Sequence, residues 1–296
     1  MHHEGRQETA RINDCLLGLY EKALPADMSW DERLKAAKDS GYEFIEISID
    51  ETDERMARVQ SETAVTEIIS AIHRYNMPIL TMCLSGNRRF PIGSENTETR
   101  NRGIALIKNA VDFSIRVGVR IVQLAGYDEY YNTPNNKTRV LFKHALEEVV
   151  SYAASRGVNL AFETMETDMM DSIKKIMKFV NNVNSPYLQV YPDVGNLTSV
   201  GINVQRDFMS GSGHIMAIHL KDTIPGKIRE IPYGDGTVDF VAFFRYLLKI
   251  NFKGLLVAEM WATQDRQSSI DYIKTAREFL LDKYNAAAGS DISKAI

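Results

Sequence analysis

Four short apolar runs in the second half of the chain each end in a residue that could ligate a metal. These are residues 158–162 before Glu163, 187–192 before Asp193, 215–218 before His219 and 255–258 before Glu259. The segments between them have the pattern of helices, and strands that alternate with helices are typical of parallel sheets. In a closed parallel barrel the carboxyl ends of all strands share one rim. The four side chains are therefore predicted to converge on one point.

The rest of the chain completes eight strand–helix units. The other strands are predicted at residues 15–20, 44–48, 78–84 and 120–125. Helices are predicted after Ser29 and Ser61 and at about 95–117, 136–156, 170–183, 203–209, 239–251 and 267–284. Eight such units are typical of the α/β class and its (β/α)8 TIM barrel. A doubly wound open sheet is the main alternative, but no Gly-rich phosphate loop follows the first strand.

The 296 residues contain no linker-like stretch, so a single domain is predicted. We expect residues 1–13 to form a disordered leader, residues 14–285 the barrel and residues 286–296 a loose tail. No apolar run approaches the roughly 18 residues of a membrane span, and the leader lacks the apolar core of a signal peptide.

Charge and cysteine content limit the classes of partner. The net charge is −4 without any basic run, whereas a nucleic-acid groove needs clustered Lys and Arg. Cys15 and Cys83 lie in apolar runs, which predicts buried thiols in a cytoplasmic protein. A disulfide between them stays an alternative. We expect neither a nucleic acid nor a membrane as partner.

Two Glu, one Asp and one His form an oxygen-rich donor set for one divalent cation, which could be Zn²⁺, Mn²⁺, Mg²⁺ or Co²⁺. Each residue also has a structural interpretation. A carboxylate at a strand end often caps a helix or forms an ion pair, and Asp193 could form an Asx turn. A single histidine such as His219 is more often a hydrogen-bonded core residue. The recurrence at the same place in consecutive units favours the metal.

The two glutamates suggest the chemistry. A ketose chelated through its carbonyl and adjacent hydroxyl oxygens has an acidified C–H group between them, and the metal stabilises the enediolate. Glu163 and Glu259 could exchange that proton on opposite faces of the sugar, which would epimerise the carbon. Because the cation holds carboxylates ionised, each glutamate would bind it through one oxygen and leave the other for the proton.

Several motifs resemble one family. The four ligands, Pro-Asp-Val-Gly-Asn at 192–196, His-Leu-Lys-Asp at 219–222 and Gly-Asp-Gly at 234–236 followed by Asp239-Phe240 resemble the xylose-isomerase-like barrels of sugar 3-epimerases. Residues 18–25, 50–55, 88–94, 124–128 and 259–261 resemble bacterial L-xylulose-5-phosphate 3-epimerases of L-ascorbate degradation. The similarity extends from Leu16 to Leu280.

The resemblance implies that the protein interconverts L-xylulose 5-phosphate and L-ribulose 5-phosphate. It also implies that Glu163, Asp193, His219 and Glu259 bind the metal, that the two glutamates are catalytic, and that the protein is a homodimer. Related epimerases of free ketoses have a His three residues after the Asp and an Arg shortly after the His ligand. Here Asn196 and Lys221 lie nearby instead, which favours a phosphorylated substrate.

A sugar phosphate needs a cation or a cluster of backbone N–H groups. Arg88 and Arg89 are the first candidates, since a helix is predicted to begin shortly after them. The alternative is a pair of solvated arginines. Lys221 and Lys22 are further candidates to bind the substrate, and Trp261 could cover its apolar edge.

Four other functions remain open for such a barrel. They are an aldose–ketose isomerase, a free-ketose 3-epimerase, a non-enzymatic sugar-phosphate binding protein and an apurinic-site endonuclease. The endonuclease needs several more histidine ligands. His73 and His144 fall within predicted helices instead, and His214 precedes its strand.

Overall fold

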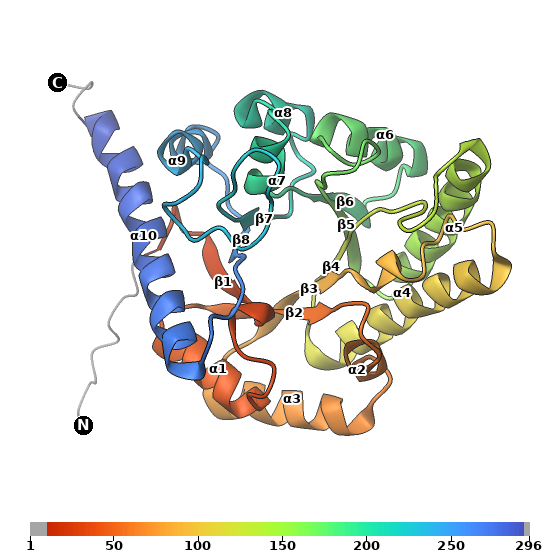
Figure 1. The fold of residues 1–296 in the computed structure, drawn as a ribbon, viewed down its shortest axis with the longest axis horizontal. Helices are drawn as coiled ribbons and strands as arrows, with labels where there is room; N and C mark the ends of the chain where they lie inside the picture. The colour runs from red at the N-terminus through yellow and green to blue at the C-terminus, as the bar shows by residue number, and fades with distance from the viewer. Residues whose placement is uncertain (1–10, 293–296) are drawn as a thin grey trace.

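Eight parallel strands form the centre of the structure, a computed structural model that describes residues 11–292 (Figure 1). The strands are β1 (Leu16–Tyr20), β2 (Phe44–Ile49), β3 (Ile79–Leu84), β4 (Ile121–Leu124), β5 (Asn159–Glu163), β6 (Leu188–Tyr191), β7 (Ala217–Leu220) and β8 (Leu255–Ala258). They are hydrogen-bonded in the order β6-β5-β4-β3-β2-β1-β8-β7. Single bridges at Val190–Ile215 and Asp193–His219 join β6 to β7, so the ring is nearly closed. The predicted TIM barrel is confirmed.

Helices surround the strands. The outer helices are α1 (Trp30–Asp39), α3 (Glu62–Tyr75), α4 (Thr97–Val117), α5 (Asn136–Ala154), α6 (Ile173–Val183), α8 (Val204–Ser210), α9 (Phe240–Lys249) and α10 (Arg266–Ile292). Ser29 and Glu32 form the predicted capping box of α1, and Ser61 caps α3. Gly118 ends α4 with φ at 90°, the left-handed conformation that a glycine adopts without strain.

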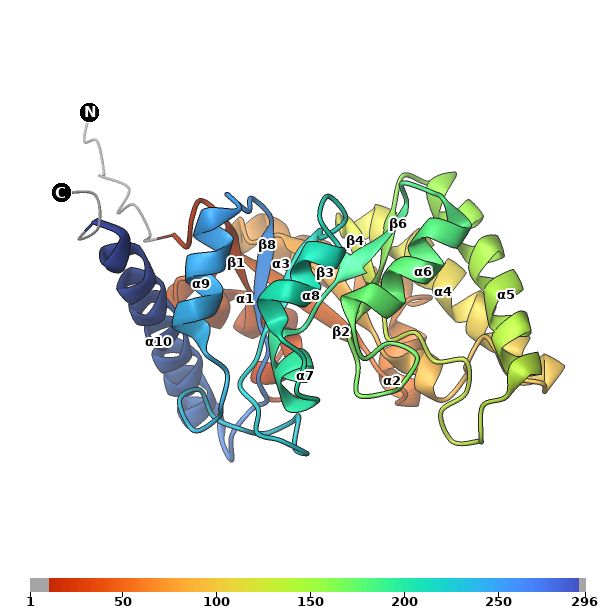
Figure 2. The same cartoon turned by 90° about the horizontal axis from the view of Figure 1, so that it is seen from above.

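Short helices that the sequence did not predict lie in the loops after the strands. They are the 3-10 helices η1 (Glu21–Ala23) and η2 (Gly86–Arg88) and the α-helices α2 (Asp53–Arg58) and α7 (Val194–Ser199). In Figure 2, α2 and α7 lie along the same edge of the barrel. Helices of three to six residues contain too few turns to show an apolar period in the sequence.

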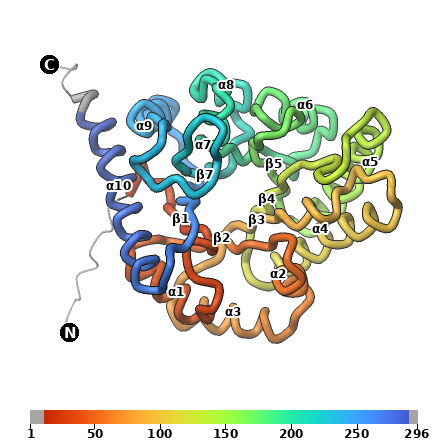
Figure 3. Tube along the Cα trace, viewed as in Figure 1, coloured from red at the N-terminus to blue at the C-terminus, as the bar shows by residue number. Residues whose placement is uncertain are grey.

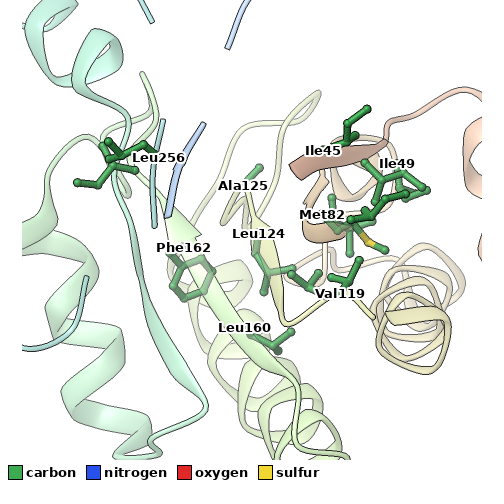
Figure 4. Packing of buried hydrophobic residues seen from close by; sticks show 14 of the residues in the cluster. Ile45, Ile49, Met82, Val119, Leu124, Ala125, Leu160, Phe162 and Leu256 are labelled. Atoms are coloured by element: carbon green, nitrogen blue, oxygen red, sulfur yellow. The ribbon is translucent and has the colours of Figure 1, made fainter. Parts of the chain in front are cut away.

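Side chains of each strand point alternately into the barrel and out toward the helices. The interior is filled by Tyr20, Phe44, Cys83, Ile121, Ala161, Tyr191, Ala217 and Val257. Outward residues such as Leu124, Leu160 and Phe162 belong to the larger core beneath the helices (Figure 4). Gly18 leaves room for Phe44, because a Cβ atom on Gly18 would lie 2.3 Å from that ring. The interior is therefore a packed core rather than a channel.

Both ends of the described chain carry specific contacts or regular structure. Ile12 is buried and bridges to Cys15, and Asn13 Nδ2 donates to the Phe252 carbonyl at 3.1 Å. Helix α10 continues to Ile292, with Ala287 fully buried. The sequence placed residues 11–13 in the leader and residues 286–292 in the tail; in the structure Ile12 and Asn13 contact other parts of the chain, and residues 286–292 continue α10. The remaining parts of the expected leader and tail, 1–10 and 293–296, lie outside the described residues.

Helix α10 packs beside α9 and completes the ring of helices back to the α1 side (Figure 3). Tyr42 donates its hydroxyl to the Ile273 carbonyl at 2.8 Å, and Arg277 Nε donates to the Gly41 carbonyl at 2.9 Å. The two cysteines are buried free thiols, as predicted. Within residues 11–292 the structure contains no helix of the length and apolarity needed to cross a membrane.

Candidate metal centre and active site

The four predicted ligands point into the barrel at the carboxyl ends of β5 to β8. Each follows an inward-facing residue by two positions, the repeat of a strand. The pairs are Ala161 and Glu163, Tyr191 and Asp193, Ala217 and His219, and Val257 and Glu259. One donor atom from each ligand lies within 4.8 Å of the others, and all four side chains are buried. The structure therefore brings together the residues that the sequence singled out.

The two glutamates approach the same nitrogen of His219. Its Nδ1 lies 3.3 Å from Oε1 of Glu163 and 3.2 Å from Oε2 of Glu259. Carboxylates so close together in a buried site repel one another unless a cation or a proton neutralises them. The donor set of carboxylate oxygens and one imidazole suits a divalent cation.

The two carboxylate oxygens of Asp193 have different surroundings. Its Oδ1 accepts hydrogen bonds from the backbone of Gly195 at 2.7 Å and of Asn196 at 3.0 Å, which caps α7. Within residues 11–292, neither Asp193 Oδ2 nor Glu259 Oε2 accepts a hydrogen bond of regular geometry. Two buried anionic oxygens need positive charge beside them, which a metal cation or a neighbouring ammonium group can supply.

Lys221 supplies a positive charge to this cluster. Its Nζ lies 2.6 Å from Asp193 Oδ2 and 3.0 Å from Glu259 Oε2. Burial opposes the charge on Lys221, but Asp193, Glu259 and Glu163 outweigh burial and raise the pKa of the ammonium above its usual range. Burial also acts against the Glu259 carboxylate, yet Lys221 and His219 hold its pKa well below the usual range. Burial raises the pKa of Asp193.

A cavity of about 190 Å³ opens above the cluster. Its lining includes Lys22, Arg88, Glu163, Asn196, Lys221, Arg229, Glu259 and Trp261. A larger cavity, of about 740 Å³, lies outside the barrel and is lined by residues of α1, α2 and α3. We assign the site to the smaller cavity, because only that one of the two contains metal-ligand candidates from the described cluster.

Five of the six predicted substrate residues line the small cavity. These are Lys22, Arg88, Asn196, Lys221 and Trp261. Arg88 extends over the ring of Tyr130, 5.0 Å from its centroid, and Lys22 forms an ion pair with Asp50 at 2.6 Å. Asn196 is buried and donates from Nδ2 to the Thr164 carbonyl at 2.8 Å.

Arg89 is the exception. Its Nη1 pairs with Asp53 Oδ1 at 2.6 Å and donates to the Glu51 carbonyl at 3.3 Å, so the structure does not bring Arg89 to the cavity. The 3-10 helix η2, which the sequence did not predict, ends at Arg88, and Arg89 is its C-terminal cap. Arg55, in the neighbouring segment 50–55, points inward and pairs with the fully buried Glu21 at 2.9 Å.

Sequence reasoning missed three residues of the site. Gln123 donates from Nε2 to Oε2 of Glu163, and Glu46 Oε1 lies 2.6 Å from Nε2 of His219. Both are polar residues inside apolar strands, two positions after an inward apolar residue, which was a usable signal. Arg229 lines the cavity from the loop between β7 and α9, where the sequence has no comparable signal.

The sequence and the structure are similar to those of known proteins. The family model described as xylose isomerase-like TIM barrel matches residues 34–283. The chain belongs to this family. The resemblance predicted from the motifs is thereby confirmed, and the description of the family as a TIM barrel agrees with the eight parallel strands found here.

Among its relatives is the L-ribulose-5-phosphate 3-epimerase UlaE of Shigella sonnei. It is 42% identical over 265 residues, which are 89% of this chain and 93% of the relative. A UlaE of Escherichia coli (strain SE11) is also 42% identical over the same shares of both chains. The solved structure of an L-ribulose 3-epimerase superposes with a TM-score of 0.78 at 17% identity, covering 95% of this chain and 98% of the other. That distant similarity supports the fold alone.

Proposed function

We propose that this protein is a metal-dependent 3-epimerase that interconverts L-xylulose 5-phosphate and L-ribulose 5-phosphate, a step of L-ascorbate degradation. The observation that carries the proposal is the placement of Glu163 and Glu259 around one buried ligand cluster, each next to Nδ1 of His219. The 42% identity to proteins named L-ribulose-5-phosphate 3-epimerase, over nearly their whole length, supports the choice of substrate.

Glu163, Asp193, His219 and Glu259 would hold one divalent cation. When bound, that cation supplies Lewis-acid polarisation of the ketose carbonyl and stabilises the enediolate charge. The donor set accepts Zn²⁺, Mn²⁺, Mg²⁺ or Co²⁺.

The two glutamates would move the proton. One glutamate, as the carboxylate, would remove the proton from C3, and the other, as the carboxylic acid, would give its proton to the opposite face of the same carbon. The first glutamate then carries the proton and the second is ionised, so proton exchange with water resets the pair for the next turnover. No atom is gained or lost, so the product differs from the substrate only in configuration at C3. The hydrogen bond from Gln123 Nε2 would orient the Glu163 carboxylate for this transfer. Lys221 would stabilise negative charge that develops on the substrate oxygens.

The phosphate would bind at the mouth of the cavity. Lys22 and Arg88 line it from the loops after β1 and β3, and Arg229 lines it from the loop after β7. A guanidinium binds a phosphate through two parallel hydrogen bonds, which makes Arg88 the principal candidate. Asn196 and Trp261 would contact the sugar. The homodimer and the cytoplasmic location expected from the sequence stay predictions.

Hydrogen exchange at carbon tests the reaction class. The metal-loaded protein is incubated with L-ribulose 5-phosphate in D₂O, and the sugar is followed by NMR. We expect deuterium at C3 together with the xylulo epimer. Deuterium at C1 with an aldose product would identify an aldose–ketose isomerase instead. Absence of exchange with bound metal would leave only a binding function, and equal rates with unphosphorylated L-ribulose would contradict the phosphate site.

A further inference from the structure

Glu46 is a fully buried carboxylate inside the barrel that the proposed reaction does not use. It lies in β2, far from the four metal-ligand candidates along the chain. Its Oε1 lies 2.6 Å from Nε2 of His219. Burial of a carboxylate costs free energy unless its oxygens have hydrogen-bond or charged partners. The partners of Glu46 therefore indicate its role.

The second oxygen of Glu46 is also hydrogen-bonded. Its Oε2 accepts from the hydroxyl of Thr81 at 2.7 Å and from the hydroxyl of Tyr191 at 2.7 Å. Thr81 is the residue paired with Glu46 across β2 and β3, so strand register sets this contact. The carboxylate therefore has a fixed position before any ligand binds.

Tyr191 contacts both Glu46 and His219. Its hydroxyl donates to Glu46, while its ring packs edge-to-face against His219 with centroids 4.8 Å apart. The ring of His219 thus meets a carboxylate at Nε2 and an aromatic ring beside it. A half-turn of the imidazole would take Nε2 away from the Glu46 carboxylate.

The two nitrogens of His219 consequently face different surroundings. Nε2 is engaged by Glu46, whereas Nδ1 faces Glu163 and Glu259, two of the other metal-ligand candidates. A neutral imidazole donates from one nitrogen and offers the lone pair of the other to a metal. The partner of the donating nitrogen decides which nitrogen that is.

We infer that Glu46 is a positioning residue: it keeps His219 protonated at Nε2 and directs Nδ1 to the cation, with Tyr191 and Thr81 holding Glu46 in place. This inference rests on the proposed metal centre. It adds a carboxylate from β2 to a site whose ligands all come from β5 to β8 and the residues that follow them.

The first measurement locates the proton. The full chain is labelled with ¹⁵N-histidine, and the signals of His219 are those absent from His219→Asn. Long-range ¹H–¹⁵N spectra are recorded before and after addition of Zn²⁺. We expect a protonated Nε2 in both states and a metal-induced shift at Nδ1. A metal-induced shift at Nε2 would overturn the inference.

The second measurement is the dissociation constant for Zn²⁺, determined by calorimetry for the wild type, Glu46→Gln and Tyr191→Phe. We expect about 10- to 100-fold weaker binding for Glu46→Gln, the usual effect of losing such a partner of a metal-bound histidine, and a smaller loss for Tyr191→Phe. Tyr42→Phe is the matched control. Tyr42 is likewise buried and donates one hydrogen bond, to Ile273 instead of the cluster, so its loss should leave Zn²⁺ binding unchanged.

The outcomes separate this inference from the proposed function. If the wild type binds no Zn²⁺, the metal centre itself is wrong. If the wild type binds Zn²⁺ and Glu46→Gln binds it within twofold as tightly, only the role of Glu46 is wrong, and a loss of stability in that variant would show a purely structural residue. Should Glu46→Gln fail to fold, Tyr191→Phe decides in the same way, because it removes one hydrogen bond and leaves the ring.

Discussion

Arg88 and Arg89 are neighbours in the chain, yet their guanidinium groups serve different parts of the molecule. Arg88 lies over Tyr130 and lines the cavity above the ligand cluster, whereas Arg89 pairs with Asp53 outside it. The two residues are therefore a matched pair for locating the phosphate.

We expect Arg88→Ala to raise the KM for L-ribulose 5-phosphate about 10- to 100-fold with a smaller effect on kcat. Hydrogen bonds to a charged group contribute about 1.5–3 kcal/mol, which corresponds to this range. Steady-state kinetics measure the change, and Arg89→Ala should behave like the wild type. Equal effects of the two substitutions would move the phosphate away from Arg88.

Glu163→Gln and Glu259→Gln should each reduce the rate of epimerisation about 10²- to 10⁴-fold at saturating metal. Each single variant keeps one of the two proton-transfer groups. It should therefore still exchange deuterium into C3 of one epimer, and the two variants should prefer opposite epimers. Glu166→Gln is the control, since Glu166 is an exposed carboxylate three residues after Glu163. Loss of exchange from both epimers in one variant would indicate a single acid–base group.

Removal of the metal should lower the Tm and abolish turnover, and a divalent cation should restore both. A ligand at 100 times its Kd stabilises the folded state by about 2.7 kcal/mol, or roughly 5 °C in Tm for a chain of this size. Thermal unfolding with and without EDTA measures the shift. Asp193→Asn should show a much smaller shift, because Asn caps α7 as well as Asp does but carries no charge for the cation. A full shift in that variant would place the cation elsewhere.

Glu21→Gln should destabilise the fold by about 3–5 kcal/mol, since it breaks a buried ion-pair network. The fully buried Glu21 pairs with Arg33 at 3.0 Å, Arg55 at 2.9 Å and Arg58 at 2.9 Å. The substitution removes the counter-charge that these three guanidinium groups share. Urea unfolding measures the loss.

The exposed ion pair of Glu62 and Arg116 provides the control for this network. Glu62→Gln should leave the urea midpoint unchanged, because water screens such surface pairs. A similarly small effect of Glu21→Gln would show that the buried network adds no stability.

The barrel and its metal cluster could be predicted because both depend on local patterns. Eight apolar runs separated by helical segments indicate the strands, and a ligand at the end of a strand takes its direction from the period of two. Ala161 before Glu163 and Val257 before Glu259 carry this information within three residues. In a closed parallel barrel the carboxyl ends of the strands then lie at one rim, independent of the loop sequences.

Only the tertiary structure decided which polar groups meet across the barrel. Glu46 and His219 are 173 positions apart, and Tyr191 and Glu46 are 145 apart, so no local pattern links them. The ion pairs that turn Arg89 outward and hold Arg55 on Glu21 likewise depend on short helices too brief to show a period.

The sequence by itself thus determined the strands, their inward faces and the four ligands, since these follow from neighbours along the chain. The hydrogen bonds that orient those ligands, and the loops that line the cavity, follow from distances in space that only the closed barrel defines.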